Sequence, residues 1–155
     1  DTFRYWLYRR WGVGPVLRFI LLNPRTAAAL LDDPTIRRCI AFAKREGFGA
    51  LRVINLYAFR ATDPAEIVKE IERCDAVGPL NPQYTREAIA EADQIVVAWG
   101  AHPAAERIGN ELGWSMIDTA IVPYCLGTTK SGAPRHPLYV PGDAPLERWA
   151  PAEEW

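Results

Sequence analysis

Short runs of apolar and β-branched residues alternate along this chain with stretches that begin like helices, and this alternation constrains the fold more than any other feature. Asp33-Pro34, Asp63-Pro64 and Asn81-Pro82 each place a capping side chain before a proline at the first helical position. Strands separated by helices of about ten residues imply parallel crossover connections. The sequence therefore predicts an α/β three-layer sandwich with a mainly parallel central sheet flanked by helices.

The same capping and turn residues set the expected boundaries. Strands are expected at residues 5–10, 16–22, 51–54, 94–98 and 121–126. Helices are expected at residues 33–46, 63–71, 81–92 and 103–112. The 155 residues are expected to form one domain (1–155), with a Pro-rich C-terminal tail at residues 141–155 as the only linker-like stretch.

Composition limits the class of protein. Apolar residues make up 49% of the chain and charged residues 24%, which is ordinary for a soluble globular domain and excludes a disordered one. No apolar run approaches the ~18 residues of a membrane helix, so we expect no membrane partner. The cysteines, Cys39, Cys74 and Cys125, are odd in number and far apart. They predict no disulfide framework and favour a reducing, cytoplasmic location.

Several chemical motifs are missing from the sequence. The Cys and His residues never lie at metal-ligand spacing, so we expect no metal. The loop at residues 127–132 lacks the spacing of a phosphate-binding P-loop, and G-x-G-x-x-G, G-x-S-x-G and H-E-x-x-H are absent. We therefore expect no cofactor. Of the adjacent carboxylates Asp32 and Asp33, helix capping accounts for Asp33 and leaves Asp32 open.

Charge is distributed unevenly along the chain. Residues 1–60 carry eleven Arg and Lys residues against four Asp and Glu, whereas residues 61–155 carry seven against fifteen. Most of the basic residues are arginines, whose forked guanidinium suits phosphate. A basic front half is compatible with a nucleic-acid or nucleotide partner, and a GC-rich genome explains the arginine excess equally well.

Amide, aromatic and histidine residues follow four of the predicted strands. Asn23 follows the second strand and Asn55 the third. Trp99 and His102 follow the fourth strand, and a polar loop after the fifth carries His136. Because ligands bind beyond the carboxyl ends of parallel strands, this convergence predicts one ligand site.

Each of these residues also has a structural interpretation. Asn23 and Asn55 are residue types that bond the local backbone at turns. A tryptophan such as Trp99 is more often a core residue than a stacking platform, and His102 leads into a helix. His136 lies in a Gly- and Pro-rich polar loop, where a functional role is more natural than a core role.

Two sets of motifs carry a resemblance to known families. The first set comprises LNPRTA (22–27), DDPTIRR (32–38), NL (55–56), AWG (98–100), TKSG (129–132) and PRHPLY (134–139). On these motifs, residues 4–141 are identified as a member of a bacterial and phage family of small proteins of unassigned function. The second set comprises LNP (22–24), VIN (53–55) followed by Arg60, VAWGAH (97–102) and HPL (136–138). This set resembles the uracil-DNA glycosylase superfamily, which implies the same fold.

The second resemblance implies a role for each matching residue. Asn23 would position the attacking water, and His136 would donate to the departing base, so both are candidate catalytic residues. Asn55 would read the base edge, which its amide donor and acceptor suit. Leu138 lies in the segment that wedges into the duplex while the target base is flipped out.

Base stacking and phosphate binding need further residues. In that superfamily an aromatic residue stacks on the base shortly after the first motif, but residues 25–35 contain none. Tyr57 or Phe59 is expected to substitute for it, and Trp99 is a further base-binding candidate. The expected phosphate contacts are Arg37, Arg38, Lys130, Ser131 and Arg135. The two helical arginines among them have an equally simple interpretation as solvated residues.

These roles lead to a functional hypothesis. The chain is expected to be a hydrolase of DNA glycosylase type that releases a modified or mismatched base from DNA, single-stranded or duplex, in DNA repair or phage-DNA defence. One alternative is a non-catalytic module on the same fold that recognises a nucleic acid or nucleotide. Another is an enzyme acting on free nucleosides or nucleotides, which would lack the steep salt dependence of polynucleotide binding.

Overall fold

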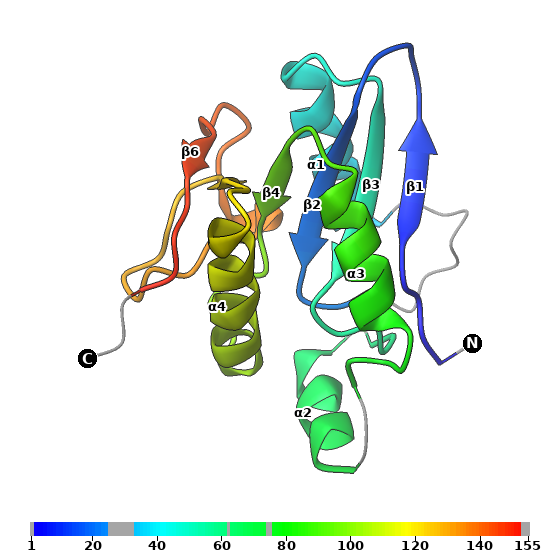
Figure 1. Cartoon of the computed structure of the whole chain (residues 1–155), viewed down its shortest axis with the longest axis vertical. Helices are drawn as coiled ribbons and strands as arrows, with labels where there is room; N and C mark the ends of the chain where they lie inside the picture. Colours follow the sequence, from blue (N-terminus) through cyan, green and yellow to red (C-terminus); the bar gives the residue numbers. More distant parts are fainter. Residues whose placement is uncertain (1, 25–32, 62, 74–75, 153–155) are drawn as a thin grey trace.

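The computed structural model of the chain describes residues 2–24, 33–61, 63–73 and 76–152 (Figure 1). Its strands are β1 (Leu7–Arg10), β2 (Val16–Leu21), β3 (Ala50–Asn55), β4 (Ile95–Val97), β5 (Pro123–Cys125) and β6 (Glu147–Arg148). Its helices are α1 (Pro34–Arg45), α2 (Pro64–Arg73), α3 (Asn81–Ala90), α4 (Pro103–Asp118) and the short 3₁₀ turn η1 (Pro137–Tyr139).

The described residues form one mixed sheet of six strands, in the order β1-β3-β2-β4-β5-β6. The four inner strands are parallel to one another, and β1 and β6 run antiparallel at the two edges. The α/β class is therefore confirmed. The sheet is mixed rather than wholly parallel, because its two edge strands are antiparallel to their neighbours. The five residues 11–15 between β1 and β2 are too few for a crossover, so β1 runs opposite to both β2 and β3.

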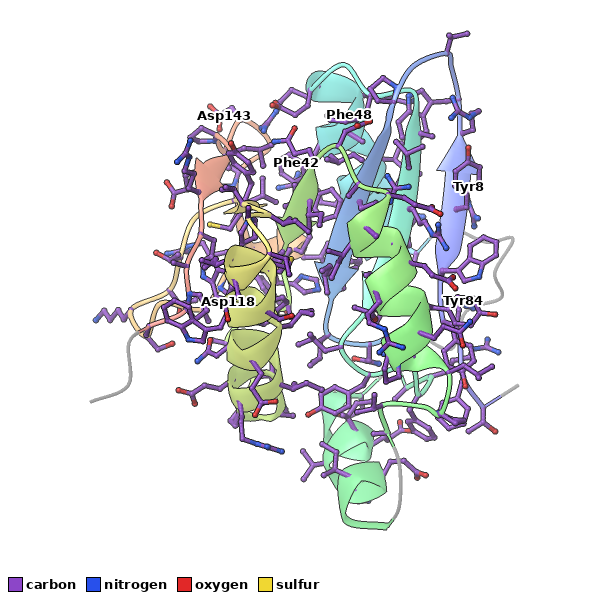
Figure 2. All side chains as sticks on the ribbon, in the orientation of Figure 1. Tyr8, Phe42, Phe48, Tyr84, Asp118 and Asp143 are labelled. Atoms are coloured by element: carbon purple, nitrogen blue, oxygen red, sulfur yellow. The ribbon has the colours of Figure 1, made fainter. Side chains whose placement is uncertain are left out.

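Helices cover both faces of this sheet (Figure 1). On one face, Cys39 and Phe42 of α1 belong to a buried cluster with residues of β2 and β3; Figure 2 shows the Phe42 side chain in this packed region. On the opposite face, Ile67 of α2, Ala88 of α3 and Ala105 of α4 join a second buried cluster. Each face thus has its own core, and the sheet separates the two.

The Pro-rich segment at residues 141–155 is, as far as residue 152, packed against the rest of the domain. β6 lies within it and pairs with β5. Trp149 is 4% exposed, and its ring meets Trp99 edge to face at a centroid distance of 5.2 Å. Its indole N–H donates to the carbonyl of Gly132 at 2.9 Å. The prolines favour a linker in the sequence, but burial of the Trp149 ring anchors the segment.

Helix α4 continues to Asp118, beyond the expected end at residue 112. Gly113 directly follows that expected end, and glycine commonly follows the last helical turn. Gly113 is instead inside the helix, where a Cβ would lie 2.5 Å from the Trp149 ring. At Gly109, one turn earlier, a Cβ would lie 2.6 Å from the Trp99 ring. Both glycines are needed because the indole rings of Trp99 and Trp149 approach the backbone of α4 closely at these two positions.

Replacing Gly49 with alanine is expected to destabilise the fold. A Cβ at Gly49 would lie 2.7 Å from the backbone C and O atoms of Val13, and a backbone segment cannot rotate away as a side chain can. We expect a loss of about 1–3 kcal/mol in the free energy of unfolding, measured by chemical denaturation. Gly12→Ala, in the turn between β1 and β2 that also contains Val13, is the matched control. Nothing lies within 4 Å of that Cβ, so a loss as large as that of Gly49→Ala would contradict this explanation.

Candidate functional site

A cavity of about 450 Å³ lies at the carboxyl ends of the central strands. Its walls come from the ends of β2 and β3, the residues after β4, the first turn of α1, the segment before β1 and the loop that carries η1. Asn23, Asn55 and His136 all line this cavity. The structure therefore brings together three residues that are far apart in the sequence.

Asn23 lies just beyond the end of β2, and its amide is held by backbone. Its Nδ2 donates to the carbonyl oxygens of Pro24, at 2.9 Å, and Ala61, at 2.7 Å. The Ala61 N–H donates back to the Pro24 carbonyl at 3.0 Å. These bonds fix the plane of the Asn23 amide and involve only its nitrogen, so its oxygen is the atom with which it can meet a ligand.

Asn55 is the last residue of β3 and is 4% exposed. Its Oδ1 is buried and has no hydrogen-bond partner within the described part of the chain. The adjacent backbone is fully engaged, because Asn81 Nδ2 donates to the carbonyl oxygens of Asn55, at 2.9 Å, and Leu56, at 3.2 Å. An unpaired buried acceptor costs about 1–3 kcal/mol, and a ligand that donates a hydrogen bond would remove this cost.

Two histidines line the cavity, and both begin a helical segment. Nδ1 of His136 accepts the N–H of Leu138 at 3.2 Å at the start of η1. Nδ1 of His102 accepts the N–H of Ala104 at 3.1 Å at the start of α4. A neutral imidazole that accepts through Nδ1 carries its hydrogen on Nε2. Each histidine is therefore a hydrogen-bond donor at Nε2.

Arg4 and Asp33 also line the cavity, and the sequence analysis missed both as site residues. The segment that carries Arg4 is anchored by its own N–H, which donates to Ala58 at 2.8 Å, and by Tyr5, whose ring stacks on Tyr84 of α3 at 5.2 Å; Tyr84 is labelled in Figure 2. Burial lowers the pKa of Arg4, and nearby arginines lower it further, whereas the Asp33 carboxylate opposes the shift.

The signals available for these two residues differ. Asp33 was recognised from its Asp-Pro pair, but only as the cap of α1, a role that its hydrogen bond with Ile36 verifies. Arg4 has no local signal, because its place depends on the antiparallel pairing of β1 with β3, which brings the N-terminal segment to the edge of the cavity.

Of the three aromatic residues expected to bind a base, Tyr57 and Phe59 are not among the residues that line the cavity, and Trp99 is. Tyr57 is buried on the α4 face, where its hydroxyl donates to the carbonyl of Ala104 at 2.5 Å and burial raises its pKa. Phe59 meets Phe3 edge to face at 6.4 Å and is not among the residues that line the cavity. Trp99 borders the cavity, but its ring packs against α4. None of these rings is presented for stacking.

Tyr139 is an aromatic residue that sequence reasoning missed. It lines the cavity, is 77% exposed, and has its ring centroid 5.5 Å from that of His136. The signal was present in the PRHPLY motif, where Tyr139 follows His136 by three residues and is next to Leu138. An exposed ring on a short helical turn is available to stack on a ligand.

The residues expected to contact phosphate fall into two groups. Arg135 and Leu138 line the cavity. Arg38 instead joins α1 to the η1 loop, because its Nε donates to the carbonyl of Pro137 at 3.1 Å and its Nη2 donates to that of Val140. Arg38 therefore has a structural role that positions the loop carrying His136.

The remaining phosphate candidates lie at the surface outside the cavity. Arg37 is exposed on α1. Lys130 and Ser131 are exposed in the turn before Gly132, where the Ser131 and Thr129 hydroxyls lie 3.0 Å apart. Ser131 borders a smaller cavity that also contacts His102. These three residues are near the site without entering it.

Some sequence expectations lie outside the described residues. Asp32 and the motif residues 25–27 are in this group. Within the described ranges, no group of three or more His, Cys, Asp or Glu side chains could hold a metal ion. Over the same ranges, none of the helices is long and apolar enough to cross a membrane.

Comparison with known proteins identifies the family. The model of one protein family, described as "Protein of unknown function (DUF1643)", matches residues 4–138. No curated protein and no solved structure matches the chain. The first of the two resemblances is therefore confirmed, whereas the resemblance to uracil-DNA glycosylases stays a prediction. Since the match spans most of its length, the chain belongs to the DUF1643 family.

Proposed function

We propose that this protein is a hydrolase of DNA glycosylase type, which releases a modified or mismatched base from DNA. The observation that carries the proposal is that Asn23, Asn55 and His136 line one cavity. These are the residues that the glycosylase resemblance assigns to the attacking water, the base edge and the departing base. They come from three separate segments, and a turn or core role for each would not require them to meet.

The chemistry of the cavity suits cleavage of an N-glycosidic bond. This reaction builds negative charge on the departing base, which hydrogen-bond donors stabilise. His136 supplies an Nε2–H donor, and Asn55 supplies a buried acceptor without a partner in the described chain. A pyrimidine of the uracil or thymine type offers both a ring carbonyl to accept a hydrogen bond and an imide N–H to donate one. A flipped base is therefore a ligand that satisfies both groups at once.

Arg135 and Tyr139 at the edge of the cavity fit a polynucleotide substrate. An exposed arginine attracts phosphate, and an exposed aromatic ring stacks on a base in a sequence-tolerant way. DNA binding should consequently weaken as salt increases, with a slope that reports the number of phosphates neutralised. An enzyme for free nucleosides would show little salt dependence.

The test is base release from synthetic oligonucleotides. Single-stranded and duplex substrates would carry uracil, G·U and G·T mismatches, hypoxanthine or bulky modified pyrimidines, and abasic sites would be detected by alkaline strand scission. We expect scission at one class of base. Oligonucleotides that bind without releasing any base would contradict the proposal in favour of a recognition module, and absence of both binding and release would contradict it in favour of free nucleosides.

Replacing Asn55 with leucine is expected to separate binding from stability. Leucine has nearly the same shape as asparagine and removes the unpaired buried Oδ1, so the free energy of unfolding should rise by about 1 kcal/mol. Base release should fall at least tenfold, because the base edge loses its partner. Denaturation and single-turnover assays on the same preparation measure the two effects.

Asn81→Leu is the matched control for this prediction. Asn81 is equally buried, and its Oδ1 also has no partner among the described residues, but its Nδ2 donates to two backbone carbonyls that leucine would leave unpaired. Its loss should therefore lower the free energy of unfolding by about 2 kcal/mol. A destabilised Asn55→Leu variant that still releases base at the normal rate would show that Asn55 is a structural residue.

A further inference from the structure

Hydrolysis of a glycosidic bond is accelerated by a group that takes a proton from the attacking water. Asn23 cannot do this, because a neutral amide orients water without accepting its proton. The two cavity histidines do not do it either. Nδ1 of His136 and of His102 already accepts a backbone N–H, so Nε2 of each carries hydrogen. Asn23 and the two histidines therefore do not supply a general base for the reaction.

Asp33 is the only carboxylate among the described residues that line the cavity. One of its oxygens accepts the N–H of Ile36 at 2.9 Å and so caps α1. This bond fixes the side chain and uses one oxygen, while a carboxylate has a second oxygen with its own lone pairs. The cap therefore orients a group that can also bind water.

The surroundings of Asp33 stabilise its negative charge. The N-terminus of α1 carries the positive end of the helix dipole. Arg4 lines the same cavity, and the Asp33 carboxylate partly opposes the lowering of the arginine's pKa. A carboxylate is one of the groups that serve as a general base.

We propose that Asp33 is the general base of the reaction, an inference that rests on the proposed function. The free carboxylate oxygen of Asp33 takes a proton from a water held by the Asn23 amide oxygen. The water oxygen forms a bond to C1′ as the C1′–N bond breaks, and the electron pair of that bond goes to the base, where the His136 Nε2–H stabilises it. The base then receives a proton from solvent, and Asp33 returns its proton to solvent. One water is added across the glycosidic bond.

The variant that tests this proposal is Asp33→Asn. Asparagine is as good a helix cap as aspartate, so α1 should keep its start, but the side chain can no longer accept a proton. Under single-turnover conditions, we expect the rate constant for base release to fall about 100-fold, the lower end of the usual contribution of a general base. The dissociation constant for the oligonucleotide should not increase, because removal of a negative charge does not weaken DNA binding.

Asp63→Asn provides a matched control. Asp63 also precedes a proline and caps the start of α2 through the N–H of Ala65 at 2.9 Å, and it does not line the cavity. Its substitution should leave the rate unchanged. Asp33→Ser, which also keeps a capping hydroxyl, is a second variant in case asparagine disturbs the fold, and its rate should fall as far.

The rate and affinity of the variants distinguish the role of Asp33 from the activity of the protein as a whole. If the wild-type protein releases base and Asp33→Asn releases it within about threefold of the same rate, Asp33 is not the general base, although the proposed function stands. If Asp33→Asn loses affinity for the oligonucleotide rather than rate, Asp33 is a binding residue and the proposal is overturned. If the wild-type protein releases no base, the proposed function fails and this inference fails with it.

Discussion

Replacing His136 with asparagine is expected to lower the single-turnover rate of base release about 100- to 1000-fold, the usual effect of removing one donor to a developing anion. Asparagine reaches only as far as Nδ1 of the imidazole, so it can still accept the N–H of Leu138 at the start of η1. The Nε2–H, which would meet the departing base, is removed. The measurement is the rate of abasic-site formation with enzyme in excess.

His136→Gln is the complementary variant. Glutamine extends to the position of Nε2 and can donate there, but it no longer matches the Nδ1 acceptor that starts η1. It should recover part of the rate while reducing stability slightly. His102→Asn, which matches His136→Asn, is a further control because His102 caps α4 in the same manner. Equal losses of rate at the two histidines would contradict the assignment of His136 as the donor.

Trp149→Ala is expected to cost about 3–5 kcal/mol in the free energy of unfolding, since it removes a buried tryptophan from the core. For a domain of this size, the melting temperature should fall by roughly 10 °C. Loss of the Trp149 ring also leaves a void beside Gly113 of α4 and removes the hydrogen bond to Gly132. Calorimetry and denaturant titration would measure both quantities.

Trp114→Ala is the control for that prediction. Trp114 lies on α4, next to Gly113, but is 39% exposed, so its replacement should change the free energy of unfolding by less than about 1 kcal/mol. A Trp149→Ala variant as stable as Trp114→Ala would mean that residues 141–152 do not contribute to the domain core.

Helix starts were the most predictable feature of the fold. α1, α2 and α3 begin at the predicted Asp-Pro or Asn-Pro pairs, because a proline in the first turn acts locally. The predicted capping role of Asn81 was wrong. Leu80 takes the N-cap position of α3 without a side-chain hydrogen bond, and the Asn81 side chain is drawn instead to the carbonyls of Asn55 and Leu56. The end of α4 was wrong, because Gly113 faces an indole that arrives from far along the chain. β6 was missed for the same reason. Its two residues pair with β5 only because Trp149 anchors the segment.

The candidate site was predictable to a similar extent. Parallel strands bring their carboxyl ends to one edge, so Asn23 and Asn55 could be placed together from the order of strands and helices alone. The aromatic residues that line the cavity could not be predicted in this way. Tyr57 comes two residues after the end of β3, but its ring lies on the α4 face of the sheet rather than the α1 face. Sequence spacing does not reveal on which side of the sheet a residue after the strand will lie.

Asp33, His102 and His136 share a property that bears on how this protein could change over evolutionary time. Each of these cavity residues is also the cap that starts a helical segment. A mutation that alters the acid–base character of the cavity therefore also frays a helix, unless the new residue is itself a cap such as asparagine or serine, so fewer replacements are tolerated at these positions. New substrate preferences would arise more readily at Tyr139 and Arg135, which are exposed and start no helix. Members of this family with different substrates should then differ at the rim of the cavity before they differ in its acid–base groups.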